Sequence, residues 1–101
     1  MNYDFHKRLK ELRMRSGISQ KELAKQMGVT RTTINSWESG ISFPNAYSLT
    51  MLSEYFYITT DYLLGMDDSE LLNISDLDEN EKNMIYDMVK LLTDIKKKNK
   101  R

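Results

Sequence analysis

The sequence predicts an all-α protein in which a compact helical domain precedes a separate C-terminal helix. Apolar residues recur at steps of three and four along much of the chain, which is the pattern of one helix face. Glycines follow the short periodic segments at positions 17, 28, 40 and 65, as expected where helices end. An acidic stretch without a clear apolar period then follows. We therefore divide the chain into a domain at 1–65, a linker at 66–78 and a helical segment at 79–101.

The first helix is predicted over roughly residues 4–15. Phe5, Leu9 and Leu12 are spaced four and three apart, which places them on one helix face. Gly17 follows this segment and suits the left-handed position just beyond a helix end.

A helix-turn-helix is predicted next. Ser19 and Glu22 form an S-x-x-E pattern, in which each side chain can accept a hydrogen bond from the other residue's backbone N–H at a helix start. This second helix ends at Gly28, and Thr30 is a suitable N-cap for a third helix that ends at Gly40. Two short helices joined by a short turn containing Gly form a helix-turn-helix.

Two further helices complete the predicted domain. Apolar residues recur at helical spacing over about 46–56, which predicts the first of these two helices. Residues 60–65 are predicted to form a one-turn helix, capped by Thr60 or Asp61 and ended by Gly65.

Two single residues of the domain have expected places. Trp37 is expected in the core rather than stacked on a base, and His6 is expected at the surface or at a helix end.

The last helix is predicted over about 79–97. Asp78 and Glu81 form a second pair of the kind that caps a helix start. Beyond them, the apolar positions step by four, three and four, and two neighbours widen the stripe. Together these residues are Met84, Ile85, Met88, Leu91, Leu92 and Ile95. Between the domain and this helix, a loose turn is expected around Leu71 and Leu72.

Composition excludes several classes of function. The chain has no Cys and a single His, which removes disulfides, thiolate zinc sites and His-paired metal sites. There is no nucleophile–base pair and no phosphate-binding Gly-rich loop, so we expect neither an enzyme nor a cofactor. No apolar run approaches the ~18 residues of a membrane span, and residues 1–20 contain no signal-peptide stretch. We expect a soluble cytoplasmic protein, associated with the nucleoid, and no membrane partner.

The formal net charge of zero conceals an uneven distribution. Residues 1–40 hold eight basic and four acidic side chains, residues 66–81 hold seven acidic and no basic ones, and residues 96–101 hold five basic and no acidic ones. Such asymmetry indicates contact between one part of a chain and a polyanion. Ordinary surface charge accounts for it equally well.

The helix-turn-helix segment and its surroundings carry specific motifs. They lie in the stretches KRLKELRMRSGISQKELAKQMGVTRTTINSWESG and LSEYFYITTDYLLG. These stretches closely resemble the Cro/repressor-type helix-turn-helix family, often called the XRE family. The resemblance covers residues 7–65 and implies a compact, lambda-repressor-like bundle of five helices. It also implies that the third helix, at 30–39, enters the major groove of double-stranded DNA.

The resemblance implies which residues of the third helix read bases. They are Arg31, Thr32, Asn35 and Ser36. Their chemistry agrees in part, because Arg can bond guanine O6 and N7, Asn can pair with adenine, and the Thr methyl can contact thymine.

DNA phosphates are expected at the helix N-termini and at nearby donors. The candidates are Ser19, Gln20, Thr33, Ser39 and Asn45, with Thr33 also able to meet a thymine methyl. Screened attraction from Arg8, Arg15 and Lys21 adds to these contacts. The loop at 41–45 lacks the Lys or Arg that relatives often carry there. We therefore expect fewer ionic contacts and a weaker salt dependence than in more basic relatives.

Arg13 and Glu38 have two possible roles. In the family, the corresponding residues commonly form a partly buried ion pair that links the first helix to the third. The alternative is a DNA contact by Arg13. We favour the structural role.

The C-terminal helix needs a partner for its apolar stripe, because an isolated helix of this length is marginal in water. It either folds back on its own domain or pairs with the same helix of a second chain, and we favour the homodimer. Glu81 falls at an a-type position of that seam, so we expect the first heptad to be frayed or outside the interface.

The sequence therefore predicts a sequence-specific transcriptional regulator, in our interpretation a repressor that binds a pseudo-palindromic operator as a homodimer. The alternative is an antitoxin or adaptor-type module whose C-terminal helix binds a different protein.

Overall fold

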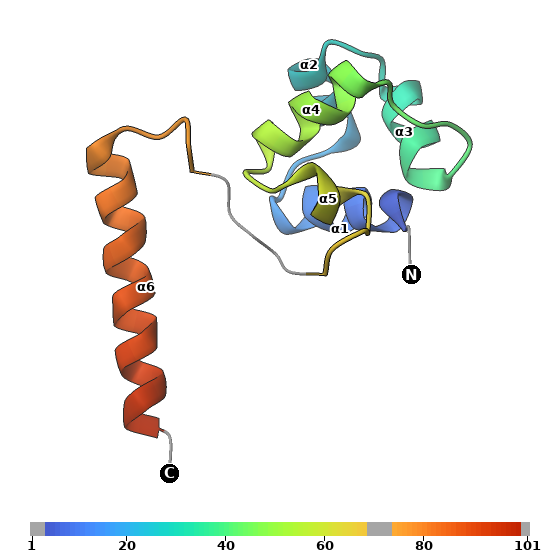
Figure 1. Ribbon diagram of the computed structural model, residues 1–101. Coiled ribbons are helices and arrows are strands. Elements are labelled where there is room, and N and C mark those ends of the chain that lie inside the picture. Colours follow the sequence, from blue (N-terminus) through green and yellow to red (C-terminus); the bar gives the residue numbers. More distant parts are fainter. Residues whose placement is uncertain (1–3, 69–73, 100–101) are drawn as a thin grey trace.

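The computed structural model describes residues 4–68 and 74–99, and within them the chain is helical. The elements are α1 (Phe5–Arg15), α2 (Gln20–Met27), α3 (Arg31–Ser39), α4 (Ala46–Tyr55), α5 (Thr60–Leu63) and α6 (Glu79–Asn99). Helices α1 to α5 gather into one bundle, and α6 stands beside it (Figure 1). The all-α architecture predicted from the sequence is confirmed. The turn expected around Leu71 and Leu72 lies outside the described residues. No helix in the described part is long and apolar enough to cross a membrane.

Side-chain caps set the start of each bundle helix. The Ser19 hydroxyl accepts a hydrogen bond from the Glu22 N–H at 3.0 Å, and Thr30 accepts one from the Thr33 N–H at 3.2 Å. The predicted reciprocal bond is not made at α2, where the Glu22 carboxylate accepts a bond from the Gln26 amide instead. Gly28 turns the chain between α2 and α3 with a φ of 70°, which strains any residue that carries a Cβ.

One capping residue differs from the expectation. The N-cap of α5 is Thr59, whose hydroxyl accepts a bond from the Tyr62 N–H at 3.1 Å, and neither Thr60 nor Asp61. The reason lies in the backbone: Thr59 is extended with a ψ of 154°, the conformation an N-cap requires, whereas Thr60 is already the first residue of the helix.

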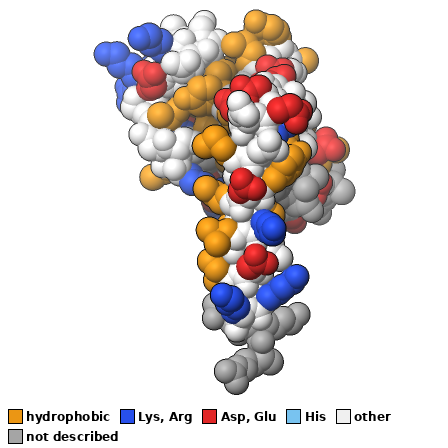
Figure 2. All heavy atoms as spheres, turned by 90° about the vertical axis from the view of Figure 1, so that its left-hand side faces the viewer, with side chains coloured by type: hydrophobic (Ala, Val, Ile, Leu, Met, Phe, Trp, Pro, Cys, Tyr) orange, Lys and Arg blue, Asp and Glu red, His pale blue; other side chains and the backbone are white. Residues whose placement is uncertain are grey.

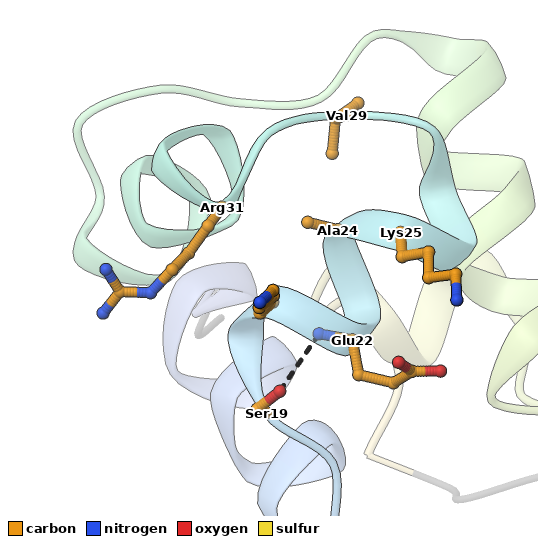
Figure 3. A pocket seen from close by; sticks show the side chains of 7 residues that line it. Ser19, Glu22, Ala24, Lys25, Val29 and Arg31 are labelled. Carbon is orange, nitrogen blue, oxygen red and sulfur yellow. Dashed lines mark hydrogen bonds between the residues drawn. The ribbon is translucent and has the colours of Figure 1, made fainter.

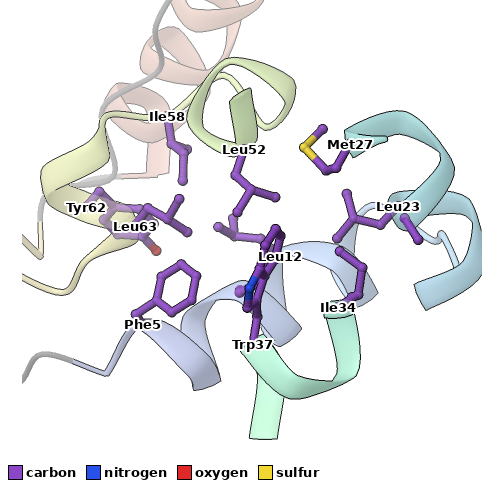
Figure 4. Close-up of a cluster of buried hydrophobic side chains, with 12 residues drawn as sticks. Phe5, Leu12, Leu23, Met27, Ile34, Trp37, Leu52, Ile58, Tyr62 and Leu63 are labelled. Carbon is purple, nitrogen blue, oxygen red and sulfur yellow. The ribbon is translucent and has the colours of Figure 1, made fainter. Parts of the chain in front are cut away.

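The core lies at the centre of the bundle and is shared by α1 to α5 and the α4–α5 link (Figure 4). Trp37 is 4% exposed, so its predicted place in the core is confirmed. The buried hydrophobic residues are Phe5, Leu9, Leu12, Leu23, Ala24, Met27, Ile34, Trp37, Leu52, Ile58, Tyr62 and Leu63. None of the described residues of α6 belongs to this core.

His6 lies near the start of α1, as expected, but it is half-buried rather than a surface residue. Its Nδ1 donates to the Trp37 carbonyl oxygen at 2.6 Å, and its ring lies 4.6 Å from that of Phe43 between ring centroids. A Cβ added at Gly40 would lie 3.4 Å from the imidazole. His6 therefore holds α1 against the end of α3.

Arg8 also has a structural role, which the sequence did not indicate. Its guanidinium donates to the Tyr62 carbonyl oxygen at 2.6 Å and lies 4.1 Å from the centroid of the Tyr62 ring. A further bond reaches the Asp67 carbonyl at 3.3 Å. Arg8 therefore fastens α5 and the residues after it to α1.

Candidate nucleic-acid interface

Helix α3 presents two different faces. Ile34 and Trp37 are buried in the core, and this fixes how the helix is rotated. The opposite face carries Arg31, Thr32 and Asn35, all exposed. Ser36 continues this face and is half-buried, as is Thr33 at its side. The four predicted base-reading residues thus share one side of a short helix.

A network of hydrogen-bonded polar side chains links the inner side of α3 to α1 and α2. The Arg13 guanidinium bonds both carboxylate oxygens of Glu38, with Nε to Oε2 at 2.6 Å and Nη2 to Oε1 at 3.1 Å. The side chains are only 12% and 3% exposed. Arg13 also donates to the Ile18 carbonyl at 2.9 Å. The structure therefore gives this pair a structural role: it joins α1, α3 and the loop before α2.

Gln20 extends this network to the exposed face. Its Nε2 donates to Glu38 Oε1 at 3.1 Å and to Asn35 Oδ1 at 3.3 Å. Because the Asn35 oxygen is engaged, its NH₂ group is available to donate to a base edge. The two N–H donors of Gln20 are both used, so its side chain contacts a phosphate through them only by releasing Asn35 or Glu38. Sequence reasoning missed this connection, which spans 15 residues between two helices.

The other residues predicted to contact phosphates differ in whether a side-chain hydrogen atom is available to donate to a phosphate. The Ser39 hydroxyl donates to the Asn35 carbonyl of its own helix at 2.8 Å, so its proton is already committed. The Ser19 hydroxyl and the Asn45 side-chain oxygen both act as acceptors in helix caps, which leaves their own hydrogen atoms available for a phosphate. Thr33 lies 3.0 Å from Thr30, hydroxyl to hydroxyl.

A surface hollow of about 680 Å³ adjoins the turn between α2 and α3 (Figure 3). Arg31 extends outward from the start of α3 beside it, and Val29 lies in the turn above it. The lining residues are Ser19, Lys21, Glu22, Ala24, Lys25, Val29 and Arg31. Three of these are cationic: Lys21 and Lys25 on α2, and Arg31 at the start of α3. Among the described residues, no group of three or more His, Asp or Glu side chains is arranged to hold a metal ion.

The residues predicted to mediate dimerisation lie on α6, away from this interface. Most of them are exposed, with Met84 at 70% and Leu91 at 60%. Ile85 is half-buried. One edge of the stripe borders an open apolar groove of about 660 Å³ beside the α4–α5 corner. Its lining residues are Phe56, Tyr57, Ile74, Leu77, Glu81, Met84, Ile85, Met88, Val89 and Leu92.

The chain is similar in sequence to known helix-turn-helix proteins. The helix-turn-helix family model matches residues 9–63. The HTH-type transcriptional activator BcrR of Enterococcus faecalis is 38% identical over 88 residues, which are 85% of this chain and 42% of BcrR. The regulator ImmR of Bacillus subtilis is 37% identical over 71 residues, 70% of this chain and 56% of ImmR. The chain thus spans about half the length of these curated relatives.

Solved structures share the fold. The P22 c2 repressor in complex with synthetic operator 9T is 33% identical with a TM-score of 0.59, covering 62% of this chain and 96% of that one. A transcriptional regulator from Listeria innocua has a TM-score of 0.63, covering 94% of this chain and 97% of its own. At 22% identity, this second likeness concerns the fold alone.

Proposed function

The chain belongs to the helix-turn-helix family and carries the DNA-binding fold of XRE-type transcriptional regulators, and we propose that it regulates transcription by binding specific double-stranded DNA sequences. The relatives it matches are regulators, not enzymes. In the proposed complex, α3 enters the major groove, with Arg31, Thr32, Asn35 and Ser36 toward the bases.

The observation that carries the proposal is the exposed face of α3 and its support. Arg31, Thr32 and Asn35 are exposed on a helix whose other face is fixed by Ile34 and Trp37. Gln20 holds the Asn35 amide in one orientation through a bond at 3.3 Å. A side chain oriented before binding loses less conformational entropy when it meets a base, which favours affinity and selectivity.

Phosphate contacts are proposed at the starts of α2, α3 and α4. The first backbone N–H groups of a helix point outward and carry partial positive charge, so they bind anions. Ser19 and Asn45, which cap α2 and α4, lie where a phosphate would meet those groups. The loop at 41–45 carries no basic side chain, so we propose that binding depends on helix ends and base contacts more than on ion pairs.

We propose that the protein binds a pseudo-palindromic operator as a homodimer and represses by occupying promoter DNA. The solved P22 c2 complex supports the operator binding, because a repressor of the same fold is bound there to an operator. Two-fold dimers fit half-sites one helical turn apart, about 34–36 Å. A reporter placed behind the selected site measures the sign of regulation: repression lowers its output, whereas activation, the activity in the name of BcrR, raises it.

The test begins with selection of bound fragments from random duplex DNA, which yields the half-site and its spacing. The double variant Arg31→Ala/Thr32→Ala is then compared with Lys10→Ala, which removes one positive charge from the exposed side of α1. Each lost base contact costs about 1–3 kcal/mol, so we expect the double variant to bind at least about ten-fold more weakly. Lys10→Ala is expected to stay within about two-fold of wild type. Equal binding by the double variant would refute the assigned face.

A second candidate function is favoured by the exposed apolar face of α6, which suits a different protein as well as a second copy. In that case the chain is an antitoxin or adaptor whose DNA binding is autoregulatory. Purification from the native host distinguishes the two, because a stoichiometric unrelated protein supports the adaptor and a homogeneous homodimer supports the regulator.

A further inference from the structure

The apolar face of α6 contributes no residue to the core, and α6 carries seven of the thirteen large hydrophobic side chains that are exposed in the described part of the chain. Met88 is 64% exposed, Leu92 53% and Ile95 46%. Figure 2 shows hydrophobic side chains along one edge of α6, with charged side chains beside them. We propose that this face binds α6 of a second copy of the chain, and that the two helices run antiparallel. This inference rests on the proposed homodimer and adds its geometry.

The positions that form the seam are symmetric about their middle. Met84, Met88, Leu91 and Ile95 follow the coiled-coil steps of four, three and four. The pattern continues by a step of three residues at each end, to Glu81 before Met84 and to Lys98 after Ile95. Reversing one helix therefore pairs Met88 with Leu91 of the second copy, and Met84 with its Ile95.

The charged ends of the seam decide between the two orientations. In a parallel pair, Glu81 meets Glu81 of the second copy and Lys98 meets Lys98, so both ends of the seam are repulsive. In an antiparallel pair, Glu81 meets Lys98 of the second copy at both ends, so both are attractive. The seam of this helix is thus complementary to itself only when reversed.

The remaining charges of α6 follow the same polarity. Asp78 and Glu79 lie at its start and Lys96 and Lys97 at its end, and basic side chains gather toward that end in Figure 2. Antiparallel helices also align their dipoles favourably, whereas parallel ones oppose them. Asp87 and Asp94 border the seam and approach the second copy's aspartates when reversed.

These aspartates weaken the preference less than the seam ends strengthen it. Both lie beside the seam and not in it, so in the pair they stay open to water and salt, which screen their repulsion more than they screen the attraction between Glu81 and Lys98. Lys90 is three residues after Asp87 and four before Asp94, so it offsets both charges on the same helix face.

The first turn of α6 is ordered, so Glu81 is positioned to take part. The Asp78 N–H donates to Glu81 Oε1 at 2.9 Å, and the Glu81 N–H donates to Asp78 Oδ1 at 2.8 Å. These reciprocal bonds close the first turn, whereas the sequence led us to expect the first heptad to be frayed or outside the interface. The second carboxylate oxygen of Glu81 is left to meet the Lys98 ammonium of another copy.

Disulfide trapping tests the orientation directly, because the chain has no cysteine of its own. Met84→Cys and Ile95→Cys are made as separate full-length variants, mixed after unfolding, refolded and oxidised. In an antiparallel pair, position 84 of one copy and position 84 of the other are about 16 Å apart, because eleven residues rise about 1.5 Å each, and the same holds for position 95. A disulfide needs Cα atoms within about 7 Å, so neither variant links to itself and only the mixture gives a covalent dimer.

A cross-linked dimer in the mixture alone supports the proposal. Covalent dimers of each variant alone mean parallel helices and overturn it. Absence of any link in a protein that sediments as a dimer places the interface elsewhere, and a monomer at micromolar concentration removes the interface; both overturn it as well.

A charge substitution provides an independent readout. Lys98→Glu turns both attractive seam ends repulsive in the antiparallel pair, so we expect the dimer dissociation constant to rise roughly ten-fold. In a parallel pair it replaces one repulsion by another and leaves the constant unchanged, which would overturn the orientation. Lys97→Glu is the matched control, because it changes the same charge at the same helix end but lies outside the seam.

Operator binding is measured on the same samples to separate this inference from the proposed function. If the mixed cysteine variants link as expected but no duplex DNA is bound, the proposed function fails and the antiparallel pair stands. If DNA is bound and the links form in the parallel pattern, the inference alone fails.

Discussion

The bundle and α6 are built from the same local signals but differ in what becomes of their apolar faces. Both have capped helix starts and apolar residues spaced three and four apart. In the bundle, these residues are buried, and Leu9 and Leu52 are fully inaccessible. In α6, Met84 and Leu91 remain largely exposed. Local sequence thus determines where a helix begins and ends, whereas its contribution to stability depends on a packing partner.

The largest expected effect comes from breaking the buried ion pair. Glu38→Ala leaves the 12%-exposed Arg13 side chain without its carboxylate, which costs about 3–5 kcal/mol of unfolding free energy. Lys90→Ala removes an exposed charge from α6 and is expected to change it by less than about 0.5 kcal/mol. Urea unfolding monitored by Trp37 fluorescence measures both. The double variant Arg13→Met/Glu38→Leu should recover much of the loss, and similar values for Glu38→Ala and Lys90→Ala would contradict the structural role of the pair.

A leucine-to-alanine substitution in each region gives the next largest effect. Leu52→Ala creates a cavity at a fully buried site, so we expect a loss of about 2–5 kcal/mol in the unfolding of the bundle. Leu91→Ala leaves this unfolding unchanged at protein concentrations where the chain is monomeric, because the side chain is 60% exposed. It is expected to weaken association instead, as measured by sedimentation. A bundle destabilised equally by Leu91→Ala would mean that α6 packs on it.

Much of the bundle was predictable from the sequence because its signals are local. Helix periodicity, the cap at Ser19 and the turn at Gly28 depend on residues within a few positions of one another. The partners of His6 and Arg8 were not predictable in this way, since they are 31 and 54 residues away and depend on how the helices pack. The predicted N-cap of α5 was wrong for a different reason. Adjacent threonines at 59 and 60 offer the same chemistry, and only the backbone conformation distinguishes them.

The candidate site shows the same contrast between what could be predicted from the sequence and what depends on how the helices pack. The family resemblance indicated Arg31, Thr32 and Asn35, and these side chains are exposed together on α3. It did not indicate that Gln20 bonds Asn35 and Glu38, because a glutamine side chain carries no signal of its partner.

Gln20 gives a third prediction, of intermediate size. Gln20→Ala releases the Asn35 amide, so we expect operator affinity to fall by about 1–2 kcal/mol while the bundle loses about 1 kcal/mol of stability. Gln26→Ala is the matched control in the same helix, because its amide bonds the exposed Glu22 and neither Asn35 nor Glu38. Titration of operator DNA at fixed salt measures the difference. If the two variants bind operator equally, the support of Asn35 by Gln20 has no functional role.

The smallest expected effect comes from the helix caps, and it decides whether the two regions unfold together. Ser19→Ala removes the bond to the Glu22 N–H in α2, so the free energy of unfolding of the bundle should fall by about 1 kcal/mol. Asp78→Ala removes the equivalent bond to the Glu81 N–H, and we expect lower helicity and weaker dimerisation with unchanged bundle stability. Circular dichroism reports the helicity, and Trp37 fluorescence reports the bundle alone. If Asp78→Ala lowers the bundle stability as much as Ser19→Ala, then α6 belongs to the same cooperative unit, and the apolar groove beside Phe56 and Tyr57 is where the two are coupled.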